Sequence, residues 1–169
     1  MASLFILLVK RLNQVAGVLS ALLILYMAAH ILLEIGLRFF DSSTYVLNEF
    51  VGYAVATLTF TGLGYTLERG GLIRVDMLVD RLSSGWRVAV DLLVSSMVLL
   101  VFSWLSWYWW LNVSRSYQRG ISSDSLANTP LWIPEGMVLI GMLIFCLTLL
   151  ARVLSLLLFR QPPLYLESH

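Results

Sequence analysis

Four long apolar runs constrain the fold of this chain more than any other feature. They cover residues 15–33, 47–67, 88–111 and 131–159. A helix needs about 20 apolar residues to cross a hydrocarbon core that is about 30 Å thick. Only 12% of the residues are charged, about half the share that is usual in soluble domains. The sequence therefore predicts an all-α integral membrane protein.

The runs and their flanks define the expected domain. We expect residues 1–169 to form a single membrane domain, with four tilted transmembrane helices at about 12–38, 47–68, 87–112 and 130–159. Between the second and third spans, apolar residues recur at helical spacing and predict a short amphipathic helix at about 72–84. We place this helix in the cytoplasmic lipid interface, because it is too short to span. The charged residues on it or beside it are Arg69, Arg74, Asp76, Asp80 and Arg81.

Basic residues set the expected orientation, because cytoplasmic segments are enriched in Lys and Arg. One side carries Lys10, Arg11, Arg69, Arg74, Arg81, Arg87, Arg152 and Arg160, and the other carries Arg38, Arg115 and Arg119. Both termini are therefore expected in the cytoplasm. An aromatic belt at the opposite interface agrees with this orientation; it consists of Trp104, Trp107, Tyr108, Trp109, Trp110 and Trp132.

Charged side chains near or inside the spans are the candidate functional residues, because burying them in a membrane is costly. Glu34 and Arg38 stand four residues apart, a spacing that favours an ion pair on one helix. With Glu49 they form a triad that could tie the first two spans together. Three roles stay open for this triad: a structural ion pair, a salt bridge to a partner protein, and ion coupling.

Two further charged groups lie near the cytoplasmic ends. Arg87 and Asp91 are expected to form a second pair at the start of the third span. Arg152 lies inside the fourth span, where it either extends to the cytoplasmic surface or meets an acid on a neighbouring helix or subunit.

Several protein classes are excluded or disfavoured. Cys146 is the only cysteine, which excludes a thiol-oxidoreductase that uses a cysteine pair. His30 is expected to be a hydrogen-bonded core residue, and a net charge of +1 points to no nucleic-acid partner. No hydrolase or phosphate-loop motif occurs, so we expect neither an enzyme nor a cofactor.

Small and turn-forming residues predict local packing. We expect close helix contacts at Gly52, Ala54, Ala56 and Gly62. Before the fourth span, Thr129 is expected to cap a helix whose first residue is Pro130.

Several short motifs in order resemble one family. They are EFVG at 49–52, TFTGLGYTL at 59–67, RGGLIRVD at 69–76, and TPLWIP at 129–134 followed by Gly141. Together they resemble the small membrane subunit (DctQ type) of tripartite ATP-independent periplasmic (TRAP) transporters, over nearly the whole chain. Leu72 stands where the family commonly has His, so no role of that His is carried over.

The resemblance implies a non-catalytic subunit of a sodium-driven transporter for an organic acid in the inner membrane of a bacterium or archaeon. Its implied partners are a large elevator subunit with about twelve spans and a periplasmic binding protein. Arg115, Arg119 and Asp124, on the periplasmic side, are candidates for docking that protein. Two alternative hypotheses for its function remain. One is a stand-alone proton-linked exporter or channel that uses Glu34 or Glu49, and the other is an anchor for another membrane complex.

Overall fold

The computed structural model describes residues 2–71 and 84–159, which form four helices. These are α1 (Ala2–Arg38), α2 (Leu47–Glu68), α4 (Ser84–Arg119) and α5 (Trp132–Phe159). The described residues contain no strand beyond one isolated bridge between Ser122 and Pro130. The interfacial helix predicted at 72–84 lies outside the described residues except for Ser84, where α4 begins.

All four predicted spans are confirmed as helices that are long and apolar enough to cross a membrane. Two of them are longer than the sequence indicates, because α1 has 37 residues and α4 has 36. At 1.5 Å per residue each is about 55 Å long, well beyond the roughly 30 Å of a hydrocarbon core. Each must therefore tilt in the membrane, extend beyond it, or do both.

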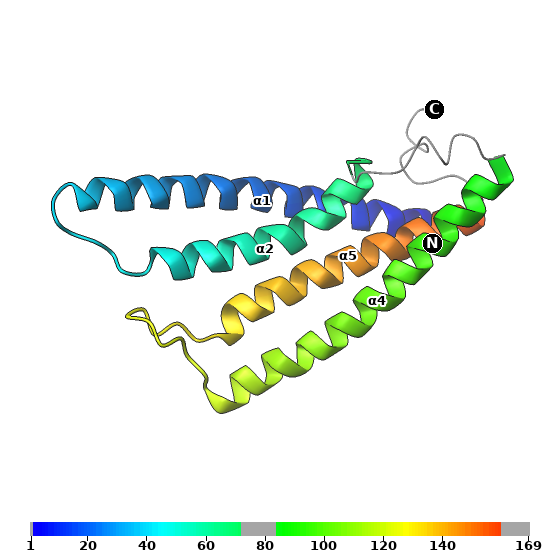
Figure 1. Ribbon diagram of the computed structural model, residues 1–169. Coiled ribbons are helices and arrows are strands. Elements are labelled where there is room, and N and C mark those ends of the chain that lie inside the picture. Colours follow the sequence, from blue (N-terminus) through cyan, green and yellow to red (C-terminus); the bar gives the residue numbers. More distant parts are fainter. Residues whose placement is uncertain (1, 72–83, 160–169) are drawn as a thin grey trace.

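The four helices form two antiparallel hairpins, α1–α2 and α4–α5, arranged across the molecule in the order α1, α2, α5, α4 (Figure 1). Helix α5 lies at the centre of the four-helix arrangement, because it contacts each of the other three helices. Most of the buried apolar residues belong to it: Val138, Leu139, Met142, Phe145, Leu149, Ala151 and Leu156. Helices α1 and α4 form the two edges and expose most of their apolar side chains.

Both hairpin turns lie at one end of the molecule, here called the loop end, and the start of α1 and the end of α5 lie at the opposite, terminal end (Figure 1). The α4–α5 loop differs from the prediction. Helix α5 begins at Trp132, and Pro130 pairs with Ser122 instead of opening the helix. Thr129 lies three residues before α5 begins, so it belongs to the loop and does not cap the helix. Its N–H donates to Ser123 Oγ at 3.0 Å.

Glycines allow the closest approach between helices. Of the predicted packing positions, Ala54 is buried and Gly62 faces α1, where an added Cβ would lie 3.8 Å from Ser20 Oγ. The tightest contacts lie at other glycines. A Cβ added at Gly52 would meet open space, so this residue is not a packing site. A Cβ on Gly141 would lie 2.8 Å from the backbone of Phe60 and Thr61. A Cβ on Gly64 would lie 2.5 Å from Asn13 Oδ1. These two contacts bring α5 against α2, and α2 against α1.

Gly141→Ala should therefore destabilise the protein. The new methyl group would meet backbone atoms of α2, which cannot rotate away, and overpacking of this kind costs roughly 1–3 kcal/mol. The matched control is Gly136→Ala on the same helix, where a Cβ has no neighbour within 4 Å. Thermal unfolding of the two purified variants in one detergent measures the difference, and equal melting temperatures would contradict the close α2–α5 contact.

Candidate functional site: polar clusters between the helices

Glu34 at the end of α1 is buried in the loop that follows it. Its carboxylate accepts hydrogen bonds from the Ser43 hydroxyl, from Thr44 Oγ1 at 2.6 Å and from the Thr44 N–H at 3.1 Å. Arg38 Nε lies 3.6 Å away, with side chains that are 71% exposed for Arg38 and 3% for Glu34. The carboxylate thus organises the reversal of the chain from α1 to α2, while the guanidinium stays largely in solvent.

Glu49 lies apart from that pair in the described structure. Its carboxylate accepts from Tyr53 OH at 2.9 Å on the same helix and from the Ser125 hydroxyl in the α4–α5 loop. The Ser125 hydroxyl lies 3.1 Å from that of Ser123 and accepts from the Ala127 N–H at 3.2 Å. Glu49 therefore joins the two hairpins at the loop end. This contact could not be predicted from the sequence, because the loop serines match ordinary turn residues.

A second contact at the same end joins α4 to α5. Asn112 Nδ2 donates to Glu135 Oε1 at 3.0 Å, and Trp109 Nε1 donates to the Glu135 carbonyl oxygen at 3.0 Å. Trp109 is therefore half-buried and holds α5, whereas Trp104, Trp107, Tyr108 and Trp110 of the predicted belt are exposed. Trp109, alone among these five, thus makes a structural contact between α4 and α5.

Asn13 connects three helices towards the terminal end. This fully buried side chain donates from Nδ2 to Glu68 Oε2 at 2.7 Å, and its Oδ1 accepts from Thr148 Oγ1 at 3.0 Å. One amide thereby joins α1, α2 and α5. This role of Asn13 was not predicted from the sequence, where the only available signal was a carboxamide close to the start of an apolar run. Nearby, Ser20 and Thr61 join α1 and α2 through their hydroxyls at 3.0 Å.

Arg152 meets an acid on a neighbouring helix, which was one of its two predicted alternatives. Its Nη2 lies 2.7 and 2.9 Å from the two Asp91 oxygens, and its Nε lies 3.2 Å from Oδ1. The Arg152 side chain is only 7% exposed, and the pair joins α5 to α4. The expected pairing of Arg87 with Asp91 stays a prediction.

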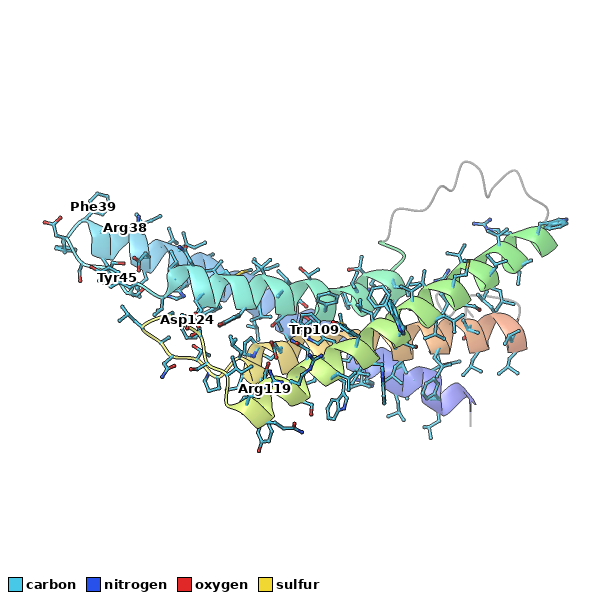
Figure 2. All side chains as sticks on the ribbon, turned by 60° about the horizontal axis from the view of Figure 1, so that its bottom comes forward. Arg38, Phe39, Tyr45, Trp109, Arg119 and Asp124 are labelled. Atoms are coloured by element: carbon cyan, nitrogen blue, oxygen red, sulfur yellow. The ribbon has the colours of Figure 1, made fainter. Side chains whose placement is uncertain are left out.

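The remaining predicted residues are more dispersed. Arg69 stacks over the Tyr65 ring at 5.3 Å, whereas Arg74, Asp76, Asp80 and Arg81 lie outside the described residues. Arg119 and Asp124 lie at the loop end (Figure 2), and Arg115 Nε donates to its own helix at the Leu111 carbonyl. His30 is confirmed as hydrogen-bonded, with Nδ1 3.2 Å from Tyr26 OH, although this contact is exposed and not in the core.

The polar side chains between the helices are thus bonded mainly to one another. Among the described residues, no group of three His, Cys, Asp or Glu side chains is placed to hold a metal ion. These features define a multi-pass helical membrane protein whose deep polar groups join helices.

Residues 27–159 match the family of the DctQ component of tripartite ATP-independent periplasmic transporters. The chain belongs to this family, which confirms the resemblance seen in its motifs, and it is a small permease subunit of a transporter. Membership implies partnership with a large membrane subunit and a binding protein.

One relative is the ectoine TRAP transporter small permease protein TeaB of Halomonas elongata. It is 27% identical over 135 residues, which cover 76% of this chain and 69% of that protein. No solved structure gives a significant match.

Replacing Arg152 should destabilise the chain more than replacing both members of its ion pair. Arg152→Met leaves the Asp91 carboxylate without its partner, at a cost of about 1–3 kcal/mol, whereas the Arg152→Met, Asp91→Asn double variant removes that charge as well. Unfolding free energies of the two variants measure the difference. Arg115→Met, which removes an exposed guanidinium, is the control. Equal losses of unfolding free energy in the single and double variants would show that Arg152 does not act mainly as the partner of Asp91.

Proposed function

We propose that this subunit enlarges and stabilises the static scaffold of a large elevator-type subunit, in a sodium-driven transporter for an organic acid. Family membership carries the proposal. The polar groups of the described helices support it, because Asn13 bonds both Glu68 and Thr148, and Arg152 bonds Asp91. Groups engaged in this way hold helices together and are not free to bind a solute.

The shape of the described part is suited to such a role. An elevator needs a stator that resists tilting while the moving domain crosses the bilayer. The order α1, α2, α5, α4 spreads the chain laterally, and both edge helices present apolar side chains to their surroundings (Figure 1). Lipid tails remove the usual hydrophobic drive for association, so contact with the large subunit would rest on packing and polar contacts between helices.

We further propose an inner-membrane location with both termini in the cytoplasm. The excess of Lys and Arg on the terminal side of the chain supports this orientation. The loop end then faces the periplasm, where a binding protein arrives. Arg115, Arg119 and Asp124 are our candidates for its docking, because they belong to the end of α4 and to the loop that follows.

Reconstitution tests the scaffold role. Liposomes that contain both membrane subunits and receive the binding protein should take up solute when a sodium gradient is applied. Omitting this chain should abolish uptake, because the large subunit loses part of its stator. This chain alone should give none. Uptake by the isolated chain would contradict the proposal and support a stand-alone exporter or channel instead.

Charge reversal tests the docking role. The Arg115→Glu, Arg119→Glu double variant should slow uptake several-fold, because rim charges mainly change the association rate of protein partners. Yield of the membrane complex should stay normal. The Arg115→Lys, Arg119→Lys variant keeps both charges and serves as the control. Uptake rates that are unchanged over a range of binding-protein concentrations would remove these residues from the docking surface.

A further inference from the structure

Helix α4 forms one edge of the four-helix arrangement and packs mainly on α5, so one of its sides is not covered by the other described helices (Figure 1). This side combines large aromatic rings with aliphatic side chains. Its exposed members recur at spacings of three and four residues, so they lie on the same side of the helix. They are Met97, Leu100, Trp104, Trp107, Tyr108, Trp110 and Leu111, here called the α4 face.

Four aromatic residues of the α4 face carry a hydrogen-bond donor. Within residues 2–71 and 84–159, none of the four has a hydrogen-bond partner. Their neighbour Trp109 lies on the other side of the helix and donates to Glu135 of α5, as described above. The fold thus uses one indole N–H of this segment to join two helices and leaves the donors of the α4 face on the outside of the chain.

Trp104 lies too deep to act as an anchor at the membrane surface. The apolar run of α4 ends at Leu111, seven residues further on, which is about 10 Å along the helix axis. The Cα–Cβ bonds of a helix are tilted towards its N-terminus. The Trp104 ring is therefore directed away from the loop end. Interfacial aromatic side chains lie at headgroup level, a level that residues close to the end of the run reach and Trp104 does not.

At this depth the Trp104 N–H needs an acceptor, and lipid tails offer none. A polar group that stays unbonded in hydrocarbon is strongly unfavourable. The side chain is 72% exposed in this chain, so its N–H is open to a group of another protein. Tryptophan, tyrosine and methionine are enriched at protein interfaces, and tryptophan and tyrosine are among the residues that contribute most to binding. The α4 face has the composition of such an interface.

The opposite edge, α1, has a different surface. The exposed residues of its apolar run are mainly aliphatic, such as Leu22, Leu25 and Leu32. Its exposed tyrosine, Tyr26, already has a partner on the same helix, because its hydroxyl lies 3.2 Å from His30 Nδ1. A surface of this kind is compatible with lipid tails. The two edges therefore differ in whether they present polar donors that still need a partner.

We propose that the α4 face binds the large membrane subunit and that α1 faces lipid. The contact consists of apolar packing around a hydrogen bond from the Trp104 N–H to an acceptor oxygen of the partner within the membrane. Packing and interhelical hydrogen bonds are the interactions that hold membrane helices together. This assignment rests on the proposed scaffold role, which requires contact between the two membrane subunits, and it specifies the edge at which they meet.

Photocrosslinking in membranes that contain the complete transporter tests the assignment. A benzophenone amino acid replaces Leu100, which is exposed near the middle of the apolar run of α4, so that all tryptophans stay in place. The matched control is Leu25, which is exposed near the middle of the apolar run of α1. After illumination, the Leu100 variant should give an adduct with the combined mass of this chain and the large subunit. The Leu25 variant should give adducts with lipid only.

Each other result would contradict a defined part of the proposal. An adduct with the large subunit from Leu25 alone would place α1 at the contact, and adducts from both positions would overturn the assignment of α1 to lipid. An adduct between two copies of this chain from Leu100, or no protein adduct there although the two subunits co-purify, would overturn the role of the α4 face. Failure of the subunits to co-purify would contradict the scaffold role itself.

A substitution tests the hydrogen bond separately. Trp104→Phe removes the N–H and keeps an aromatic ring, so it should weaken association with the large subunit about five-fold, the net contribution of one hydrogen bond. Thermal unfolding of the full chain alone should not change. Trp109→Phe is the matched control, because it should lower the melting temperature of the chain through loss of the bond to Glu135. Titration of the two purified subunits in one detergent measures the affinity, and an unchanged value for Trp104→Phe would overturn this hydrogen bond.

Discussion

The close approach of α5 to the α1–α2 hairpin is the contact on which the rest of the structure depends. Gly141 brings the backbone of α5 against Phe60 and Thr61 of α2, where no larger residue would fit without displacement. A turn or two along the same helix, Thr148 reaches Asn13 of α1. In a membrane, helix association draws on tight packing and interhelical hydrogen bonds. This seam has both, so it fixes the register of one hairpin against the other.

Carboxylates stabilise the arrangement in two ways: one joins the two hairpins, and two others join the helices within each hairpin. At the loop end, Glu49 bonds a serine of the opposite hairpin, so that a loop and not a helix face makes the connection. Towards the terminal end, Glu68 bonds Asn13 and Asp91 bonds Arg152. Each of these acids has a partner on another element. Because each acid is paired, the chain can place these few charged residues next to apolar surroundings.

The sequence predicted the parts of the fold that follow from composition and from the periodicity of apolar residues. The four spans came from apolar runs, and the partner of Arg152 was one of two stated alternatives. The position of the close contacts could not be predicted, because Gly52 and Gly141 look alike until the rotation of each helix is known. The contacts of Asn13 and Ser125 could not be predicted for a related reason. Their partners, Thr148 and Glu49, are distant in sequence, and only the fold brings each pair together. The predicted triad of Glu34, Arg38 and Glu49 does not form, because Glu49 bonds Ser125 in the α4–α5 loop instead.

The register of the two hairpins is costly to change. Sliding α5 along α2 by a turn or more would separate Asn13 from Thr148 and move Gly141 away from the α2 backbone, where a side chain would then collide. Those losses amount to about 1 kcal/mol for the hydrogen bond and roughly 1–3 kcal/mol for the packing. Because both losses occur together, the seam holds the two hairpins in a single register.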